Sequence, residues 1–174
     1  MIALDTNILV YARREESAHH AEARRLLTEL AEGDMPWALP WPCVYEFLRV
    51  VTHPRLFDPP TGLDEALDDL ESLFGSSSLS LLGESPAHAG HLRNAVQGGS
   101  AKGNMVHDAH IAALVMEHGV RELWTTDRDF ARFPGLRFRN PFAKPQLSEP
   151  PSRYPAVGRA RRTKRVGRAA SSRG

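Results

Sequence analysis

The chain has 174 residues, of which 41% are hydrophobic and 25% charged, a size and composition typical of one globular domain. A single cysteine excludes an internal disulfide, and no apolar run approaches the length of a membrane span. The net charge of +1 is unevenly distributed: residues 1–150 hold 14 Lys and Arg against 21 Asp and Glu, whereas residues 151–174 hold 8 Lys and Arg and no acid. No early segment resembles a signal peptide, so we expect a cytoplasmic protein that does not insert into a membrane.

The N-terminal half of the chain alternates short apolar runs with amphipathic segments. Strands are predicted at residues 2–4, directly before Asp5, and at residues 37–39. Helices are predicted, in chain order, at residues 6–13, 18–32, 42–52 and 63–74. In the last of these, apolar residues recur at helical spacing and Gly75 follows the end of the pattern.

The C-terminal half continues the same alternation. Strands are predicted at residues 79–82, 122–126 and 136–139, and helices at residues 86–97 and 104–118. A glycine-rich loop separates these two helices. Short strands that alternate with helices predict an α/β fold with a mainly parallel central sheet.

Four acidic residues lie beside predicted strand ends or near helix starts. Asp5 and Asp127 follow predicted strands, at the carboxyl ends where open parallel sheets bind ligands. Glu46 lies in the helix 42–52, and Asp108 lies in the first turn of the helix 104–118, on the face of its apolar residues. An unpaired carboxylate is costly to bury, and oxygen ligands of this kind suit Mg²⁺ or Mn²⁺. The four acids therefore predict metal-dependent chemistry on a phosphate.

Each acid also has an ordinary structural explanation. Asp5 could cap the helix that follows it, and Glu46 could pair with Arg49, one helical turn away. Asp108 could be favoured by the dipole at a helix N-terminus, and Asp127 could stabilise a turn. Each signal is therefore weak by itself, and the prediction rests on the four acids together.

Polar residues beside these acids are candidates for holding them in place. Asn7 could cap a helix or hold Asp5. The hydroxyls of Thr6 and Thr126 could orient a carboxylate, or they could serve only packing and turns.

The histidines near one of these acids allow a different metal chemistry. His107 and Asp108, followed by His110, match the His-Asp dyad of HD-type phosphohydrolases. That fold is all-helical, however, whereas this chain has strands predicted on both sides of the dyad. We expect His88 and His91 to be surface residues, because they follow no evident ligand spacing.

The acidic motifs, taken in order, resemble those of the PIN-domain nucleases, and most of all the VapC toxins of type II toxin–antitoxin modules. The segments that carry this resemblance are residues 4–9, Glu46, residues 103–113 and residues 125–130. The resemblance covers residues 1–142 and predicts a PIN-like nuclease domain. Residues 143–174 lie outside it and are predicted to form a basic, disordered tail able to bind phosphates non-specifically.

The resemblance implies a three-layer α/β/α sandwich and a Mg²⁺-dependent endoribonuclease, with Mn²⁺ as a possible substitute. Asp5, Glu46, Asp108 and Asp127 would be the catalytic residues, and Asp5, Asp108 and Asp127 the metal ligands. Hydrolysis through a metal would leave 5′-phosphate and 3′-hydroxyl ends.

The resemblance also implies partners. They are a cognate VapB-type antitoxin, an RNA substrate of the tRNA or rRNA class, and a second copy of the chain in a homodimer. Trp37, Trp41, Phe47 and Leu48 are candidates for the antitoxin groove. The non-enzymatic alternative is a chain with an inactive pocket that binds RNA through its tail.

Overall fold

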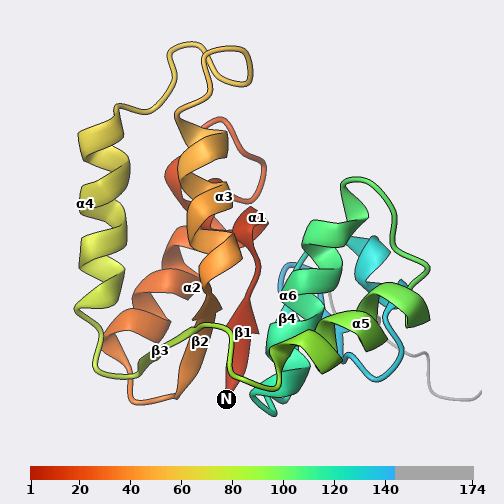
Figure 1. Ribbon diagram of the computed structural model, residues 1–174. Helices are drawn as coiled ribbons and strands as arrows, with labels where there is room; N and C mark the ends of the chain where they lie inside the picture. The colour runs from red at the N-terminus through yellow and green to blue at the C-terminus, as the bar shows by residue number, and fades with distance from the viewer. Residues whose placement is uncertain (144–174) are drawn as a thin grey trace, which may run out of the picture. The chain divides into compact units, whose positions relative to one another are not determined.

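Five parallel strands form a single sheet in the computed structural model, which describes residues 1–143 (Figure 1). The strands are β1 (Ile2–Leu4), β2 (Trp37–Pro40), β3 (Leu79–Leu82), β4 (Glu122–Trp124) and β5 (Phe138–Arg139), and their order in the sheet is β3-β2-β1-β4-β5. All four strand pairings are parallel. The predicted α/β class is thus confirmed, while the predicted tail, apart from Ala143, lies outside the described residues.

Six α-helices connect these strands. They are α1 (Thr6–Arg13), α2 (His20–Glu32), α3 (Trp41–Val51), α4 (Leu63–Phe74), α5 (His88–Gly98) and α6 (Met105–Glu117). One further element was not predicted, a short 3-10 helix at Arg128–Arg132. Within residues 1–143, no helix is long and apolar enough to cross a membrane.

The helices form two groups that cover the sheet. Helix α1 packs against α2 and α3, and α3 packs against α4, whereas α5 packs mainly against α6. The chain crosses the sheet in one direction from β1 to β3 and returns from β3 to β4, so right-handed connections place the two groups on opposite faces. In Figure 1, α1 to α4 lie on the left and α5 and α6 on the right. This arrangement confirms the expected three layers.

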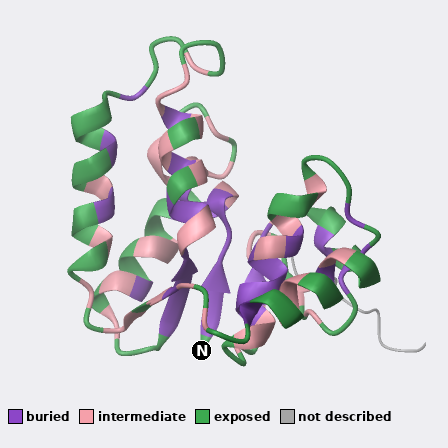
Figure 2. Ribbon diagram, in the orientation of Figure 1, coloured by how far each residue is buried: buried purple, intermediate pink, exposed green. Residues whose placement is uncertain are grey.

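The core lies between the sheet and the inner faces of the helices. Strands β1 and β2 are buried along their whole length, while α2 and α4 bury one side and expose the other (Figure 2). Helix α6 is exceptional, because a continuous run of five residues from Ile111 to Val115 is buried. A helix with a buried run of this length is enclosed by the core rather than lying on the surface.

The strand order reverses between β1 and β4. The two strands pair with Ile2 opposite Glu122, and the backbone N–H of Asp5 extends the contact by donating to the carbonyl of Trp124 at 3.1 Å. The chain leaves the two strands toward opposite sides of the sheet at this point, which opens a crevice at their carboxyl ends. Asp5 and Thr125 stand at that crevice.

Candidate active site

Asp5 lies at the bottom of the site, where it caps α1 and anchors a buried network of hydrogen bonds. One carboxylate oxygen, Oδ1, accepts from the backbone N–H of Thr6 at 2.7 Å. The other, Oδ2, accepts from the Thr125 hydroxyl and from the Asn7 side-chain amide, both at 2.6 Å. The residue is only 5% exposed. Asp5 is therefore both the cap considered from the sequence and a carboxylate held in one orientation.

Thr125 connects Asp5 to the acidic segment that follows β4. Its hydroxyl oxygen also accepts from the Asn7 amide and from the backbone N–H of Asp127, each at 2.9 Å. Of the two roles considered for Thr126 from the sequence, the structure favours packing, because the Thr126 hydroxyl bonds that of Tyr11 at 3.0 Å. Successive side chains at the end of an extended strand point to opposite faces. Which of Thr125 and Thr126 points toward Asp5 therefore depends on the residue at which β4 ends.

Glu46 extends from α3 to the mouth of the site and has two partners. The Thr6 hydroxyl donates to its Oε2 at 3.0 Å, and Arg49 donates to its Oε1 at 2.8 Å. The pair with Arg49 is the ordinary explanation considered from the sequence. Thr6 also donates its backbone N–H to Asp5, so Glu46 and Asp5 share a partner. Glu46 therefore belongs to the site although it also pairs with Arg49.

Asp108 and Asp127 complete the acidic group from two other elements. Asp108 lies in the first turn of α6 and is half-buried. Asp127 caps the 3-10 helix by accepting from the backbone N–H of Asp129 at 2.8 Å. Burial raises the pKa of Asp108 to about 6, and repulsion from Asp127, Glu46 and Asp129 adds to the shift. These carboxylates are therefore close enough to repel one another.

The ionisation of Asp5 shows the same electrostatic coupling. Burial raises its pKa from 3.8 to about 7. Hydrogen bonds from Thr125 and Thr6 oppose the shift, whereas repulsion from Glu46 and Asp108 increases it. Cys43, a neighbour that the sequence did not indicate, places its Sγ 4.0 Å from Asp5 Oδ1, and burial raises its thiol pKa well above 9.0. The thiol is therefore neutral and adds no charge to the site.

A cleft of about 940 Å³ opens beside these acids, between α3 and α6. Glu46, Asp108 and Asp129 line it, and Arg49 is the only Lys or Arg among its lining residues in the described chain. Arg13 and Arg14, two of the basic residues near the acidic motifs, form ion pairs with Glu65 and Glu16, respectively. The cleft is thus predominantly acidic.

The donor set fits a hard divalent cation. It consists of carboxylate oxygens, two of which have raised pKa values because they are buried among like charges. A divalent cation would remove that repulsion, and oxygen donors of this kind are preferred by Mg²⁺ and Mn²⁺. That Asp5, Asp108 and Asp127 hold such a cation stays a prediction.

The histidines do not form an HD-type centre with Asp108. His110 Nε2 lies 3.1 Å from Glu84 Oε1, and the His110 ring packs against that of His88 with ring centroids 4.9 Å apart. His88 is only 5% exposed, so the expectation that it is a surface residue was wrong. Its partner is Glu117, 29 residues further along the chain, whose Oε2 lies 2.6 Å from His88 Nδ1. Neither sequence spacing nor a motif indicates such a contact.

Comparison with known proteins agrees with the geometry. The PIN domain family matches residues 2–136. The chain is 34% identical over 139 residues to Ribonuclease VapC48 of Mycobacterium tuberculosis, with 80% of this chain and 96% of that protein aligned. It is 38% identical over 141 residues to Ribonuclease VapC43 of the same organism, with 81% and 95% aligned. Among solved structures, VapBC2 from Rickettsia felis, bound to a DNA fragment from its promoter, matches with a TM-score of 0.57 and 24% identity, over 80% of this chain and 98% of that one.

Proposed function

This chain belongs to the PIN-domain family and to its VapC ribonucleases, and from that premise we propose that it is the toxin of a type II toxin–antitoxin module, a Mg²⁺-dependent endoribonuclease restrained by a cognate antitoxin. The observation that carries the proposal is the convergence of Asp5, Glu46, Asp108 and Asp127 at the reversal point of the sheet. Burial and mutual repulsion raise the pKa of Asp5 to about 7 and that of Asp108 to about 6. Such an arrangement is costly for the folded protein without a cation.

Each acid has a distinct part in the proposed site. Asp5 is the most deeply buried and the most firmly held of the four, so it would be the ligand that orients a bound metal. Asp108 and Asp127 supply further carboxylate oxygens from α6 and from the loop after β4, and Glu46 acts from the mouth of the cleft. A bound divalent cation supplies Lewis-acid chemistry, which activates water and stabilises the charge that develops on the scissile phosphate.

The proposed substrate is structured RNA of the tRNA or rRNA class. An acidic cleft repels a phosphate backbone, so binding depends on the cation and on basic residues around the rim. Arg49 lies on that rim, where it already contacts Glu46. We propose residues 1–142 as the nuclease domain and the basic residues 143–174 as a tail that adds non-specific phosphate binding. A homodimer stays a prediction.

The chemical nature of the products tests this proposal. Full-length protein incubated with end-labelled total RNA and Mg²⁺ is expected to release fragments with 5′-phosphate and 3′-hydroxyl ends, and none in EDTA. Product ends are read by ligation and by phosphatase sensitivity. Products with 2′,3′-cyclic phosphates would exclude the metal-activated water and would point to attack by the 2′-hydroxyl of the RNA itself.

Replacing Thr125 tests the hydrogen-bond network beneath the site. Thr125→Val removes the hydroxyl that donates to Asp5 Oδ2 and accepts from Asn7 and Asp127. Loss of a hydrogen bond to a charged group costs roughly 1–3 kcal/mol, so cleavage is expected to slow by about 10-fold. The pH of half-maximal activity should also rise, because the Thr125 bond lowers the pKa of Asp5. Thr126→Val is the matched control, and equal effects of the two substitutions would refute the role given to Thr125.

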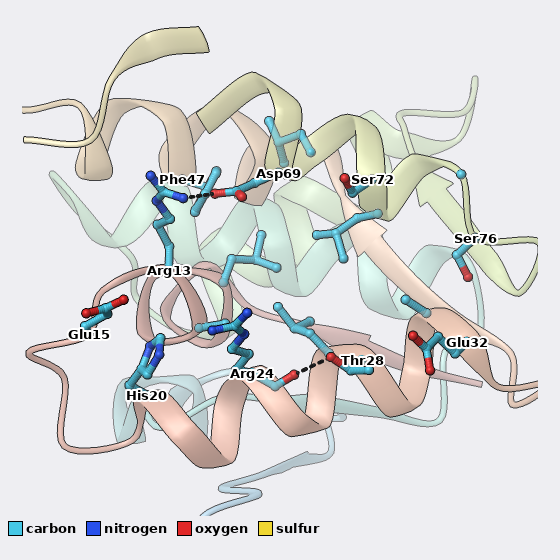
Figure 3. A pocket seen from close by; sticks show the side chains of 17 residues that line it. Arg13, Glu15, His20, Arg24, Thr28, Glu32, Phe47, Asp69, Ser72 and Ser76 are labelled. Carbon is cyan, nitrogen blue, oxygen red and sulfur yellow. Dashed lines mark hydrogen bonds and ion pairs between the residues drawn. The ribbon is translucent and has the colours of Figure 1, made fainter. Parts of the chain in front are cut away.

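The antitoxin is proposed to occupy a second cleft, on the other side of α3. Figure 3 shows this cleft, of about 750 Å³, bounded by α1, α2 and α4. Its large apolar lining residues are Leu9, Leu27, Phe47, Leu70 and Leu73, with Ala12 and Ala31 beside them, and its charged lining residues include Arg13, Arg24 and Asp69. An apolar groove between helices with charged edges suits an amphipathic helix of a partner.

The structure changes the set of residues expected for this groove. Phe47 does line it, but it is largely buried, and Trp37 is fully buried in the sheet. Trp41 lines the acidic cleft instead. Helix α3 thus separates the two clefts, with Phe47 toward the groove and the neighbouring Glu46 toward the acids.

A charge placed in this groove should separate antitoxin binding from catalysis. Leu27→Asp introduces a carboxylate among the apolar residues of the groove, and the affinity for the antitoxin is expected to fall by at least 10-fold, as for loss of a buried interface anchor. Ribonuclease activity of the free toxin should persist. Leu63→Asp on α4 is the control, because Leu63 is 59% exposed and lies outside the groove lining. Co-purification and titration with the antitoxin provide the measurement, and undiminished affinity of the Leu27 variant would refute this location.

A further inference from the structure

A second group of potential metal ligands lies where the loop after β3 and the start of α5 meet α6. Glu84 belongs to the loop, His88 is the first residue of α5, and His110 lies on α6. Helices α5 and α6 pack side by side (Figure 1). One ligand atom of each of the three side chains lies within 4.8 Å of the other two. None of the three belongs to the acidic group described above.

Each of the two histidines has a buried Nε2 atom that makes no hydrogen bond within residues 1–143. The nearest polar contact of His110 Nε2 is with Glu84 Oε1, at 3.1 Å. An unpartnered polar atom in a residue that is only 5% exposed, such as His88, is costly. A ligand bound between the two rings would satisfy both nitrogens.

A fourth residue, Glu117, fixes the ring of His88 from behind. Glu117 Oε2 lies 2.6 Å from His88 Nδ1, and Glu117 Oε1 accepts from the backbone N–H of Ser85 at 2.9 Å. This contact orients the ring of His88 with Nδ1 toward Glu117 and leaves Nε2 as the nitrogen available to a ligand. A carboxylate behind a histidine is the usual support of a metal-binding imidazole.

We propose that Glu84, His88 and His110 bind a divalent transition-metal ion, with Zn²⁺ as the best match. Two imidazole nitrogens and one carboxylate are a donor set that suits Zn²⁺ and related ions and disfavours Mg²⁺, which prefers oxygen. Zn–N bonds of about 2.0–2.1 Å require the ligands to draw closer together. Glu84, whose side chain is 63% exposed, is free to make most of that movement.

The bound ion would join the β3–α5 loop to α6. His110 lies two residues after Asp108 on the same helix, and Glu84 and His110 line the acidic cleft. A metal ion bound there would therefore restrain α6, the helix that carries Asp108. None of the four proposed catalytic acids would be a ligand of that ion. Its consequence is structural: Zn²⁺ should stabilise the folded protein through these residues, whether or not the chain cleaves RNA.

Calorimetric titration of untagged, full-length protein with Zn²⁺, in excess Mg²⁺ that occupies the acidic site, tests the proposal, with thermal unfolding as a second readout. Binding of one equivalent is expected in the wild type, at least 10-fold weaker binding in Glu84→Ala and His110→Ala, and roughly 10–100-fold weaker binding in Glu117→Gln. If a substitution of a buried residue prevents folding, Glu84→Ala still tests the proposal. Glu84 is exposed, so the protein is expected to fold without its side chain. His91→Ala on α5 is the matched histidine control and should bind as the wild type does.

A variant of the acidic site distinguishes this proposal from the proposed function. Asp5→Asn should retain the Zn²⁺ equivalent assigned to Glu84, His88 and His110, even though it is expected to lose cleavage. Failure of the wild type to bind Zn²⁺ would overturn the inference. So would binding that survives both Glu84→Ala and His110→Ala, or binding that is lost only in Asp5→Asn.

Discussion

Asp5→Asn is expected to reduce RNA cleavage by roughly 10²–10³-fold or more, the cost typical of removing one group that stabilises charge in a transition state. The substitution is almost isosteric, but it removes the charge of the most deeply buried acid in the site. It also places an amide where Thr125 and Asn7 now donate to a carboxylate. The rate of cleavage of end-labelled RNA at saturating Mg²⁺ provides the measurement.

The control for this prediction is Asp34→Asn, in the turn between α2 and β2. Asp34 is exposed and is absent from both clefts. Its variant should cleave RNA at the wild-type rate. If Asp5→Asn folded normally and retained cleavage within a few-fold of the wild type, Asp5 could not be a principal metal ligand.

Without a divalent cation, the protein should lose stability as the pH rises from about 4 to about 7. Asp5 has a pKa of about 7 in the folded chain and 3.8 as an ordinary carboxyl group. The unfolded chain therefore releases this proton near pH 4, whereas the folded chain retains it until near pH 7, so a rise in pH between these values favours unfolding. At 1.36 kcal/mol per pH unit, the loss is ~4 kcal/mol. Asp108, with a pKa of about 6, acts in the same direction.

Thermal unfolding in EDTA and in Mg²⁺ between pH 5 and pH 8 measures this effect. The stabilisation by Mg²⁺ should grow with pH and reach about 10 °C, from the usual relation between free energy and melting temperature for a chain of this size. Asp5→Asn should flatten the dependence in EDTA. Glu117 does not affect this measurement. Its pKa is about 2 in the folded chain, so its contribution to the stability of the fold is lost only below the pH range measured. A Mg²⁺ effect that is equal at pH 5 and pH 8 would contradict the raised pKa of Asp5.

The acidic group could be predicted from the sequence because local patterns place each member. Asp5 directly follows a buried apolar strand, and Asp108 shares the buried face of α6 with residues one turn later, such as Ile111. Strands alternating with helices then imply a parallel sheet, whose carboxyl edge brings such residues together. The observed strand order agrees with that reasoning.

The residues that the sequence analysis missed are held by long-range contacts. Thr125 and Asp5 are 120 residues apart, and which of two adjacent threonines turns inward depends on where β4 ends. His88 lies on the face of α5 that carries Leu92 and Ala95, but its partner Glu117 belongs to another helix. Contacts of this kind arise from helix packing, which no local periodicity encodes.

Anomalous diffraction from crystals grown with Mn²⁺ shows whether the four acids hold a metal ion. We expect an anomalous peak between Asp5 and Asp108, within coordination distance of their carboxylate oxygens, and loss of that peak in Asp5→Asn crystals. Manganese located only at Glu84, His88 and His110, or no peak at the four acids in crystals at saturating Mn²⁺, would contradict a metal-dependent nuclease site at the reversal point of the sheet.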